Sequence, residues 1–184
     1  LREPMILGHE VAGVVIARAP DVTSPAIGDL VAVNPSHPCG HCDFCQRGLQ
    51  NHCRNMRFYG SAMRFPHVQG AFRERLVADA RQCFVLPPAT PPAAAAMAEP
   101  FSVALHAVER AGPLIDRRVL VTGCGPIGSL VALAARLNGA REIVVTDIVD
   151  EALDRVLAVG ADRTINVARD GEAMTALAAD KGTF

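Results

Sequence analysis

The chain has 184 residues, half of them apolar and a fifth charged, which is the balance of a globular protein with one ordinary domain or parts of two. Its formal net charge is −1 without any basic run, so nucleic-acid binding has no electrostatic support. The uncharged stretches 82–98 and 119–135 are broken by prolines and glycines, and the start carries no basic-then-apolar leader, so we expect a cytoplasmic protein without a membrane partner.

The first half of the chain is predicted to be mostly β-structure. Residues 11–17 and 30–33 are short runs rich in β-formers. Residues 34–70 are dense in proline, glycine, histidine and cysteine, and a loop of that length inside a compact domain is usually functional or cross-linked. Two further strands are expected at 71–78 and 82–86.

The second half is predicted to alternate strands and helices. Four prolines between residues 87 and 92 mark a boundary, and 93–111 follows as a helix interrupted near Pro100. The expected strands are 119–122, 142–147 and 163–166, and the expected helices are 127–138, 151–159 and 172–180. This alternation favours a parallel sheet with crossover helices, so we expect two domains, residues 1–91 and 92–184.

Four cysteines in the long loop have the spacing C-x2-C-x2-C-x7-C: Cys39, Cys42, Cys45 and Cys53. Four thiolates form a closed tetrahedral shell around zinc with no open position for chemistry, which predicts a structural zinc that fixes the loop. An iron–sulfur cluster is the rival, but its bacterial run has a last gap of three residues followed by proline. Four unrelated cysteines are the remaining alternative. Cys83 and Cys124 lie in or beside apolar strands and are interpreted as small core residues.

The run Gly8-His9-Glu10 places an imidazole next to a carboxylate at the start of a predicted strand. Adjacent strand residues point to opposite faces, so both side chains reach one ion only if the chain turns at Gly8. Glu99 is an acid among mostly apolar neighbours, and a metal is a sensible partner for it, although a helix N-terminus would also favour an acid there. These residues are candidate ligands of a catalytic zinc, which takes three protein ligands and keeps an open position.

The segment from Gly123 to Gly128 reads G-x-G-x-x-G, follows a predicted strand and opens a predicted helix. Glycines there allow a tight turn and a close approach of the backbone to a pyrophosphate. Asp147 ends the next strand, where an acid would bond ribose hydroxyls and repel the extra phosphate of NADP, so NAD is favoured. A tight turn without a nucleotide is the alternative. The expected cofactor-binding residues are Gly123, Gly125, Pro126, Ile127, Gly128 and Asp147.

These motifs occur in the order and at the separations of the zinc-containing medium-chain dehydrogenases, which the chain resembles over essentially its whole length. Glu99-Pro100 in place of a cysteine ligand resembles the polyol branch of that family. Residues 34–42, 56–63 and 65–68 resemble the members that interconvert L-idonate and 5-keto-D-gluconate.

The resemblance implies an α/β chain with a partial GroES-like, β-rich catalytic domain followed by a partial Rossmann domain with a doubly wound parallel sheet. It implies two zinc ions per subunit, a nicotinamide cofactor and a homotetramer. The catalytic zinc would lie at His9, Glu10 and Glu99, with family members differing in which acid touches the metal, and the structural zinc at the four cysteines. The first catalytic-zinc ligand of the family is a cysteine upstream of His9, so we expect the chain to be the middle of a longer protein and inactive alone.

Two other functions stay open on the sequence. The first is another dehydrogenase of the same family, acting on sorbitol, xylitol, threonine or butanediol. The second is a zinc-stapled binding module without catalysis, which leaves the glycine fingerprint and Gly-His-Glu unexplained. A sugar acid also needs groups that hold its carboxylate, for which Arg57, Arg64 and His67 are candidates, with solvated surface residues as the alternative.

Overall fold

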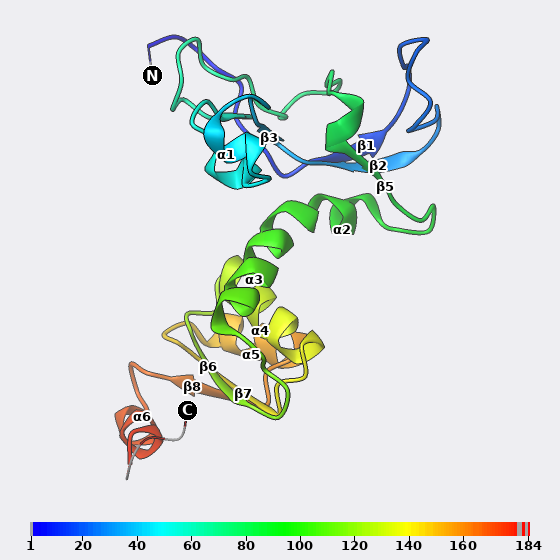
Figure 1. The fold of residues 1–184 in the computed structure, drawn as a ribbon. Coiled ribbons are helices and arrows are strands. Elements are labelled where there is room, and N and C mark those ends of the chain that lie inside the picture. The colour runs from blue at the N-terminus through cyan, green and yellow to red at the C-terminus, as the bar shows by residue number, and fades with distance from the viewer. Residues whose placement is uncertain (1, 180–181, 183) are drawn as a thin grey trace. The chain divides into compact units, whose positions relative to one another are not determined.

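The computed structural model describes residues 2–179, 182 and 184, which divide into two compact units, Leu1–Glu99 and Pro100–Phe184. Each unit has its own sheet, as Figure 1 shows. The domain boundary between residues 91 and 92 stays a prediction. Within the described residues, no helix combines the length and the apolar character needed to cross a membrane.

The first unit contains a three-stranded antiparallel sheet. Its strands are β1 (Ala12–Val14), β2 (Leu30–Val33) and β5 (Cys83–Val85), in the order β1-β2-β5. The central strand β2 is the most buried, because Val31, Ala32 and Val33 are all covered. The predicted strand at 30–33 is therefore confirmed, while those at 11–17 and 82–86 are shorter than predicted.

The long loop predicted at 34–70 is confirmed, with short elements inside it. A two-residue ladder joins β3 (Ser36–His37) to β4 (Arg57–Phe58). Between these strands lie α1 (Asp43–Gln46) and the 3-10 helix η1 (Gln50–His52). The ladder closes the base of the segment that carries the four cysteines.

The strand predicted at 71–78 is wrong. The amides of Gly70, Ala71 and Phe72 donate to carbonyls of residues 6–8, but in an order that makes no regular ladder. The Arg73 amide then donates to the Ala71 carbonyl at 2.7 Å, which turns the chain. The β-forming residues in this segment are thus outweighed by its pairing with the chain that leads to Gly8.

Gln82, at the end of the 3-10 helix η2 (Ala80–Gln82), is a buried amide that joins several loops of the first unit. Its Nε2 donates to the carbonyls of Asn34 and Ser36 at 2.8 and 3.0 Å. Its Oε1 accepts from the Tyr59 hydroxyl at 3.3 Å and from the Asp79 amide at 3.4 Å. Because both ends of the side chain are satisfied, one residue holds the base of the cysteine loop to β5.

The predicted helix at 93–111 is interrupted near Pro100, as expected, with the break three residues before the proline. It consists of α2 (Pro92–Ala96) and α3 (Ala98–Ala111), and the break is at Met97. Pro100 lies in the first turn of α3, where a missing N–H costs no intrahelical hydrogen bond. In the first unit, α2 packs against β1 and β2.

The second unit is a parallel sheet of β6 (Arg118–Thr122), β7 (Glu142–Asp147) and β8 (Arg163–Asn166), in the order β6-β7-β8. The crossover helices are α4 (Pro126–Leu137) and α5 (Asp150–Val159), and α6 (Gly171–Leu177) follows β8. These bounds confirm the predicted alternation. The prediction that the last helix extends to residue 180 ends outside the described residues.

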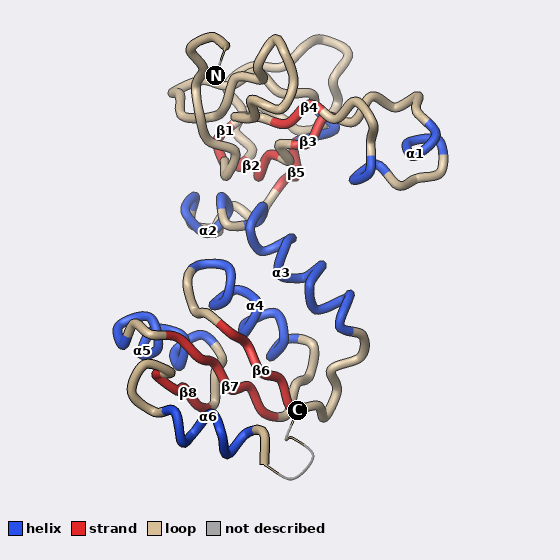
Figure 2. The backbone as a smooth tube through the Cα atoms, turned by 90° about the vertical axis from the view of Figure 1, so that its left-hand side faces the viewer, coloured by secondary structure: helices blue, strands red, loops and turns tan. Residues whose placement is uncertain are grey.

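Both faces of this sheet are covered by helices, as Figure 2 shows. Ile143 and Val145 of β7 belong to one buried cluster with residues of α3, α4 and α5. Val144 points to the other face and packs with Ile165 and with Leu177 of α6. Alternate residues of one strand thus enter separate cores, as a sheet covered on both faces requires, and the predicted fold class is confirmed.

We predict that Gln82→Leu destabilises the first unit by about 2–4 kcal/mol, because the leucine leaves buried carbonyls and donors without a partner. The chain has one tyrosine and no tryptophan, so tyrosine fluorescence during urea unfolding reports on Tyr59 in this network. The exposed Gln69, which accepts one hydrogen bond from the Ile6 amide, offers a control in Gln69→Leu. An unfolding midpoint for Gln82→Leu no lower than that of the control contradicts the prediction.

Candidate metal and cofactor sites

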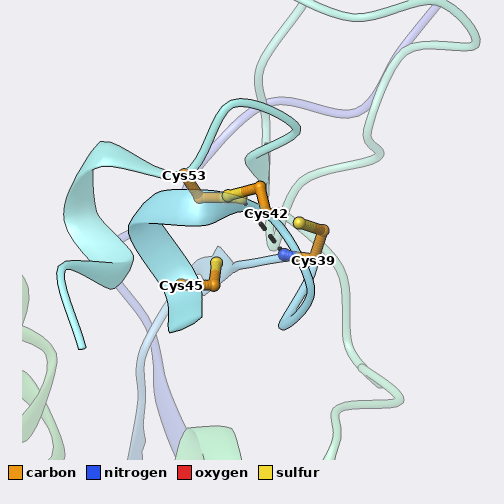
Figure 3. A group of neighbouring side chains, drawn as sticks. All are labelled: Cys39, Cys42, Cys45 and Cys53. Carbon is orange, nitrogen blue, oxygen red and sulfur yellow. Dashed lines mark hydrogen bonds between the residues drawn. The ribbon is translucent and has the colours of Figure 1, made fainter. Parts of the chain in front are cut away.

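The four cysteines converge on one point of the loop, as Figure 3 shows. Cys39 follows β3, Cys42 is the N-cap of α1, Cys45 lies within α1, and Cys53 follows η1. Their sulfur atoms all lie within 4.8 Å of one another. A tetrahedral zinc with sulfur bonds of about 2.3 Å needs only a modest contraction of this cluster.

The surroundings of the sulfur atoms suit a bound cation. The amides of Cys45 and Arg54 lower the pKa of Cys42 to about 6, and the Cys39 amide, which donates to the Cys53 sulfur at 3.2 Å, lowers that of Cys53. Burial instead raises the pKa of Cys45 to about 12. A metal would therefore have to ionise Cys45, which zinc does to the thiols it binds. The residues present fit a structural zinc site of four cysteines.

His9, Glu10 and Glu99 form a second cluster in the first unit, with one ligand atom from each lying within 4.8 Å of the others. Gly8 has φ +92°, so the chain turns there as the sequence analysis required for His9 and Glu10 to reach one ion. Glu99 comes from the first turn of α3. One nitrogen and two oxygen donors fit a zinc with three protein ligands.

This second cluster depends on a close backbone approach that the sequence analysis missed. A Cβ on Gly70 would lie 2.3 Å from the Leu7 carbonyl oxygen, and one on Gly60 would lie 2.8 Å from the Gly8 carbonyl oxygen. The Phe72 ring lies against Gly8, and the Phe58 ring packs edge-on to the His9 imidazole with centroids 5.2 Å apart. Unexplained glycines in a loop were the signal that could have pointed to this packing.

The glycine fingerprint forms the tight turn between β6 and α4. Gly123 has φ +86°, and its amide donates to the Thr146 carbonyl of β7 at 2.7 Å. A Cβ on Gly128 would lie 1.9 Å from the Gly123 carbonyl oxygen, so only glycine fits there. Pro126 occupies the first turn of α4, where its missing N–H is harmless. This is the geometry of a loop that brings main chain close to a phosphate.

Asp147 lies at the end of β7, beside this turn. Its Oδ2 accepts from the Cys124 amide at 2.6 Å, and its Oδ1 accepts from the amides of Ile148 and Val149 at 2.7 and 3.1 Å. These three amides hold the pKa of the Asp147 carboxyl below its usual range. The acid is therefore ionised at neutral pH and fixed in orientation.

A depression of about 650 Å³ lies along β6 between α3 and α4. The fingerprint residues Gly123, Gly125, Pro126, Ile127 and Gly128 line one part of it. Apart from Thr122, the rest of the lining is apolar. The structure thus gathers five of the six predicted cofactor-binding residues at one depression, and places Asp147 next to the same turn.

The three candidates for holding a carboxylate are engaged with the protein's own backbone. Arg57 donates to the Pro66 carbonyl at 3.3 Å, and Arg64 donates to the Arg54 carbonyl. His67 is buried, accepts from the Arg2 amide at 3.0 Å and contacts the Arg64 carbonyl. These contacts show that the three side chains stabilise the loop. That any of them binds the carboxylate of a substrate stays a prediction.

We predict that Cys45→Ser lowers the bound zinc by one ion per chain, because a hydroxyl is a poor replacement for a thiolate ligand. Structural zinc contributes on the order of 10 kcal/mol in small domains, so the cysteine loop should also lose its protection from proteolysis. Metal analysis of the purified protein measures the first effect. Cys83→Ser, a half-buried thiol outside the cluster, should keep the full zinc content. Retention of that content in Cys45→Ser would show that this cysteine is not a ligand.

We predict that Gly70→Ala weakens zinc binding at the second cluster about 10-fold or more, the usual effect of disturbing the support of a metal ligand. The added methyl group pushes the Leu7 carbonyl and shifts the turn that orients His9. Titration of the zinc-loaded protein with a chelator should show a lowered zinc affinity at one site and an unchanged affinity at the other. Gly13→Ala is the control, since a Cβ there meets no atom within 4 Å. Equal zinc retention in the two variants contradicts the prediction.

The sequence matches known proteins along its length. Residues 1–88 match the family model described as the alcohol dehydrogenase GroES-like domain. The chain is 42% identical over 184 residues to the L-idonate 5-dehydrogenase (NAD(P)(+)) of Escherichia coli (strain K12), covering 100% of this chain and 52% of that protein. It is 39% identical over 181 residues to an L-threonine 3-dehydrogenase of Edwardsiella ictaluri, covering 97% of this chain and 51% of that one.

Structural comparison agrees with the sequence matches. A crystal structure of L-idonate 5-dehydrogenase from Escherichia coli K-12 aligns with a TM-score of 0.91 and 43% identity, covering 98% of this chain and 51% of that one. The chain therefore spans about half the length of the relatives it matches. With a GroES-like region, a four-cysteine zinc site and a Rossmann-type sheet in this order, the chain belongs to the zinc-type medium-chain dehydrogenases.

Proposed function

We propose that the protein is a zinc-dependent oxidoreductase that transfers a hydride between a secondary alcohol and a nicotinamide cofactor. The observation that carries this proposal is the cluster of His9, Glu10 and Glu99, whose ligand atoms lie within 4.8 Å of one another. A binding module stapled by the cysteine site has no use for a second donor set of this kind. The proposed architecture is a catalytic domain at residues 1–91 and a cofactor domain at residues 92–184.

The residues of the first unit divide into two roles. The four cysteines use all four positions of a tetrahedral metal, so their site is structural. His9, Glu10 and Glu99 supply three donors and leave a position for substrate. A zinc ion held there would supply Lewis-acid stabilisation to the substrate hydroxyl as it loses its proton, which favours hydride loss from the adjacent carbon. Phe58 and the Gly8 turn hold the His9 imidazole in place.

The residues of the second unit bind the cofactor in this proposal. Gly123, Gly125 and Gly128 bring main chain close to the pyrophosphate, and Asp147 accepts hydrogen bonds from the adenosine ribose. The carboxylate would repel a 2′-phosphate, which supports NAD over NADP. The protein positions the cofactor, and the nicotinamide accepts the hydride.

The substrate class we propose is a polyol or sugar acid, with L-idonate as the first candidate and 5-keto-D-gluconate as its product. The 42% identity to an L-idonate 5-dehydrogenase supports this choice, and the 39% identity to an L-threonine 3-dehydrogenase supports the runner-up, another alcohol of the same family. Sorbitol, xylitol and butanediol belong to the same group of alternatives. The expected assembly is a homotetramer.

We predict that the full-length zinc-loaded protein reduces NAD with L-idonate at least 10-fold faster, by kcat/KM, than with sorbitol or L-threonine, a preference worth about 1.4 kcal/mol of transition-state stabilisation. Absorbance of NADH at saturating NAD provides the measurement. His9→Ala is the matched control, because it removes a catalytic-zinc ligand and leaves the cysteine site intact. A higher kcat/KM with sorbitol or L-threonine would support the proposed type of reaction and contradict L-idonate as the substrate. Absence of reduction with all three, in protein shown to hold two zinc ions, contradicts the proposal.

A further inference from the structure

A hydrogen-bonded network joins the segments that leave β7 and β8 at the carboxyl edge of the parallel sheet. Asn166 ends β8, is 5% exposed, and pairs in register with Asp147 at the end of β7. Its Nδ2 donates to the Ile148 carbonyl at 3.2 Å and to Oδ1 of Asp150 at 2.7 Å. The buried amide therefore fixes the carboxylate of Asp150 beside the segment that carries Asp147.

Asp150 holds the guanidinium of Arg169, which follows β8, by two hydrogen bonds. Nη1 donates to Oδ2 at 2.8 Å, and Nη2 donates to Oδ1 at 2.7 Å. Asn166 and then Arg169 hold the pKa of the Asp150 carboxyl below its usual range. The pair is thus ionised at neutral pH, and its two-point geometry is one that arginine also uses to bind phosphate groups.

This ion pair is not needed to neutralise a buried charge, since the side chains of Arg169 and Asp150 are 62% and 51% exposed. Exposed ion pairs contribute little to folding stability. Asp150 is also the first residue of α5, where the helix dipole favours an acid without any cation. The stability of the fold therefore does not explain why a cation on the loop after β8 is held at this place.

In the proposed function, the pair lies next to the place where NAD and NADP differ. Asp147 bonds the adenosine ribose there, and NADP carries its extra phosphate on the 2′-oxygen of that ribose. An arginine near this edge of a Rossmann sheet can accommodate the phosphate. Arg169 has that chemistry, but the carboxylate of Asp150 engages both of its terminal nitrogens.

We propose that Asp150 withholds the Arg169 guanidinium from the 2′-phosphate of NADP, so that this ion pair is a specificity determinant that favours NAD. The inference rests on the proposed use of a nicotinamide dinucleotide. Asp147 disfavours NADP by repulsion, whereas Asp150 does so by engaging the cation that would otherwise attract the phosphate. Loss of the Asp150 charge should therefore do more than remove a negative charge, because it also releases a positive one.

The test is a double-mutant cycle in the full-length, zinc-loaded protein. Asp150→Asn removes the charge and keeps an oxygen that accepts from Asn166, and Asp150→Ser is a second, smaller replacement. Arg169→Gln removes the cation, alone and combined with Asp150→Asn. Asp154→Asn is the control, because it removes an exposed acid one turn further along α5. Dissociation constants for NADH and NADPH are measured by titration calorimetry, and their ratio reports on recognition of the 2′-phosphate.

We expect Asp150→Asn and Asp150→Ser to strengthen the binding of NADPH relative to NADH about 10-fold, the effect of one charge-assisted hydrogen bond. Arg169→Gln alone should leave the ratio unchanged, since the pair already withholds the cation. The double variant should lose the gain, because no cation is left to release. Asp154→Asn should change the ratio by less than about twofold, since solvent and salt screen a charge at that distance.

The outcomes are distinguishable. A gain that persists in the double variant would assign the effect to repulsion by Asp150 and overturn the role of Arg169. Constant ratios in both Asp150 variants, with thermal unfolding midpoints that show them folded, would leave the pair as a structural contact. Equal binding of NADPH and NADH by the unchanged protein also contradicts the inference, while the proposed hydride transfer stands. Binding of neither dinucleotide overturns the proposed function itself, and the inference with it.

Discussion

Close approach of backbone to backbone is the constraint on which the cluster of His9, Glu10 and Glu99 and the glycine fingerprint both depend. In the first unit, Gly70 packs against the chain that leads to His9, and a Cβ on Gly70 would lie 2.3 Å from the Leu7 carbonyl oxygen. In the second unit, a Cβ on Gly128 would lie 1.9 Å from the Gly123 carbonyl. Atoms cannot approach that closely, so a side chain at either position must displace the neighbouring main chain and disturb the site. The chemistry of the donors is secondary to this geometric requirement.

The cysteine cluster solves a different problem, because its loop has little core of its own. The described residues between β3 and β4 bury few side chains, among them Cys45 and Cys53. Metal–sulfur bonds would replace hydrophobic burial there, as in small zinc domains. The base of the loop is held differently, by the hydrogen bonds of Gln82. Metal and amide thus stabilise opposite ends of the same segment.

Much of the fold could be read from the sequence, for reasons that differ between the two units. In the second unit, apolar strands and amphipathic helices alternate, and this local periodicity located β6, β7, β8 and their helices to within a few residues. The strand predicted at 71–78 failed because its β-forming residues pair irregularly with residues 6–8. That pairing is a contact between distant parts of the sequence, which local propensity does not contain.

The candidate sites also divide into features that local sequence predicts and contacts between distant parts of the chain that it does not. Ligand spacing identified the cysteine cluster, whose four members lie within fifteen residues, and the turn at Gly8 was a stated requirement for the second cluster. Glu99 was separated from His9 by ninety residues, so only chemistry and family resemblance could connect them. The supporting side chain of Phe58 and the contact of Cys124 with Asp147 had no sequence signal beyond their positions near a motif.

The burial of β7 has a consequence for hydrogen exchange. Ile143, Val144 and Val145 are fully buried, and the strand is hydrogen-bonded on both edges, so its amides should exchange only when the whole unit opens. Asp147 ends this strand, whereas Ile148 and Val149 after it are exposed. Asp147, the acid proposed to bind the ribose, therefore stands at the border between the slowest-exchanging and the faster-exchanging parts of the unit. Substitutions beyond this border can alter cofactor preference with little effect on cooperative folding, whereas substitutions a few residues earlier would unfold the domain that carries the site.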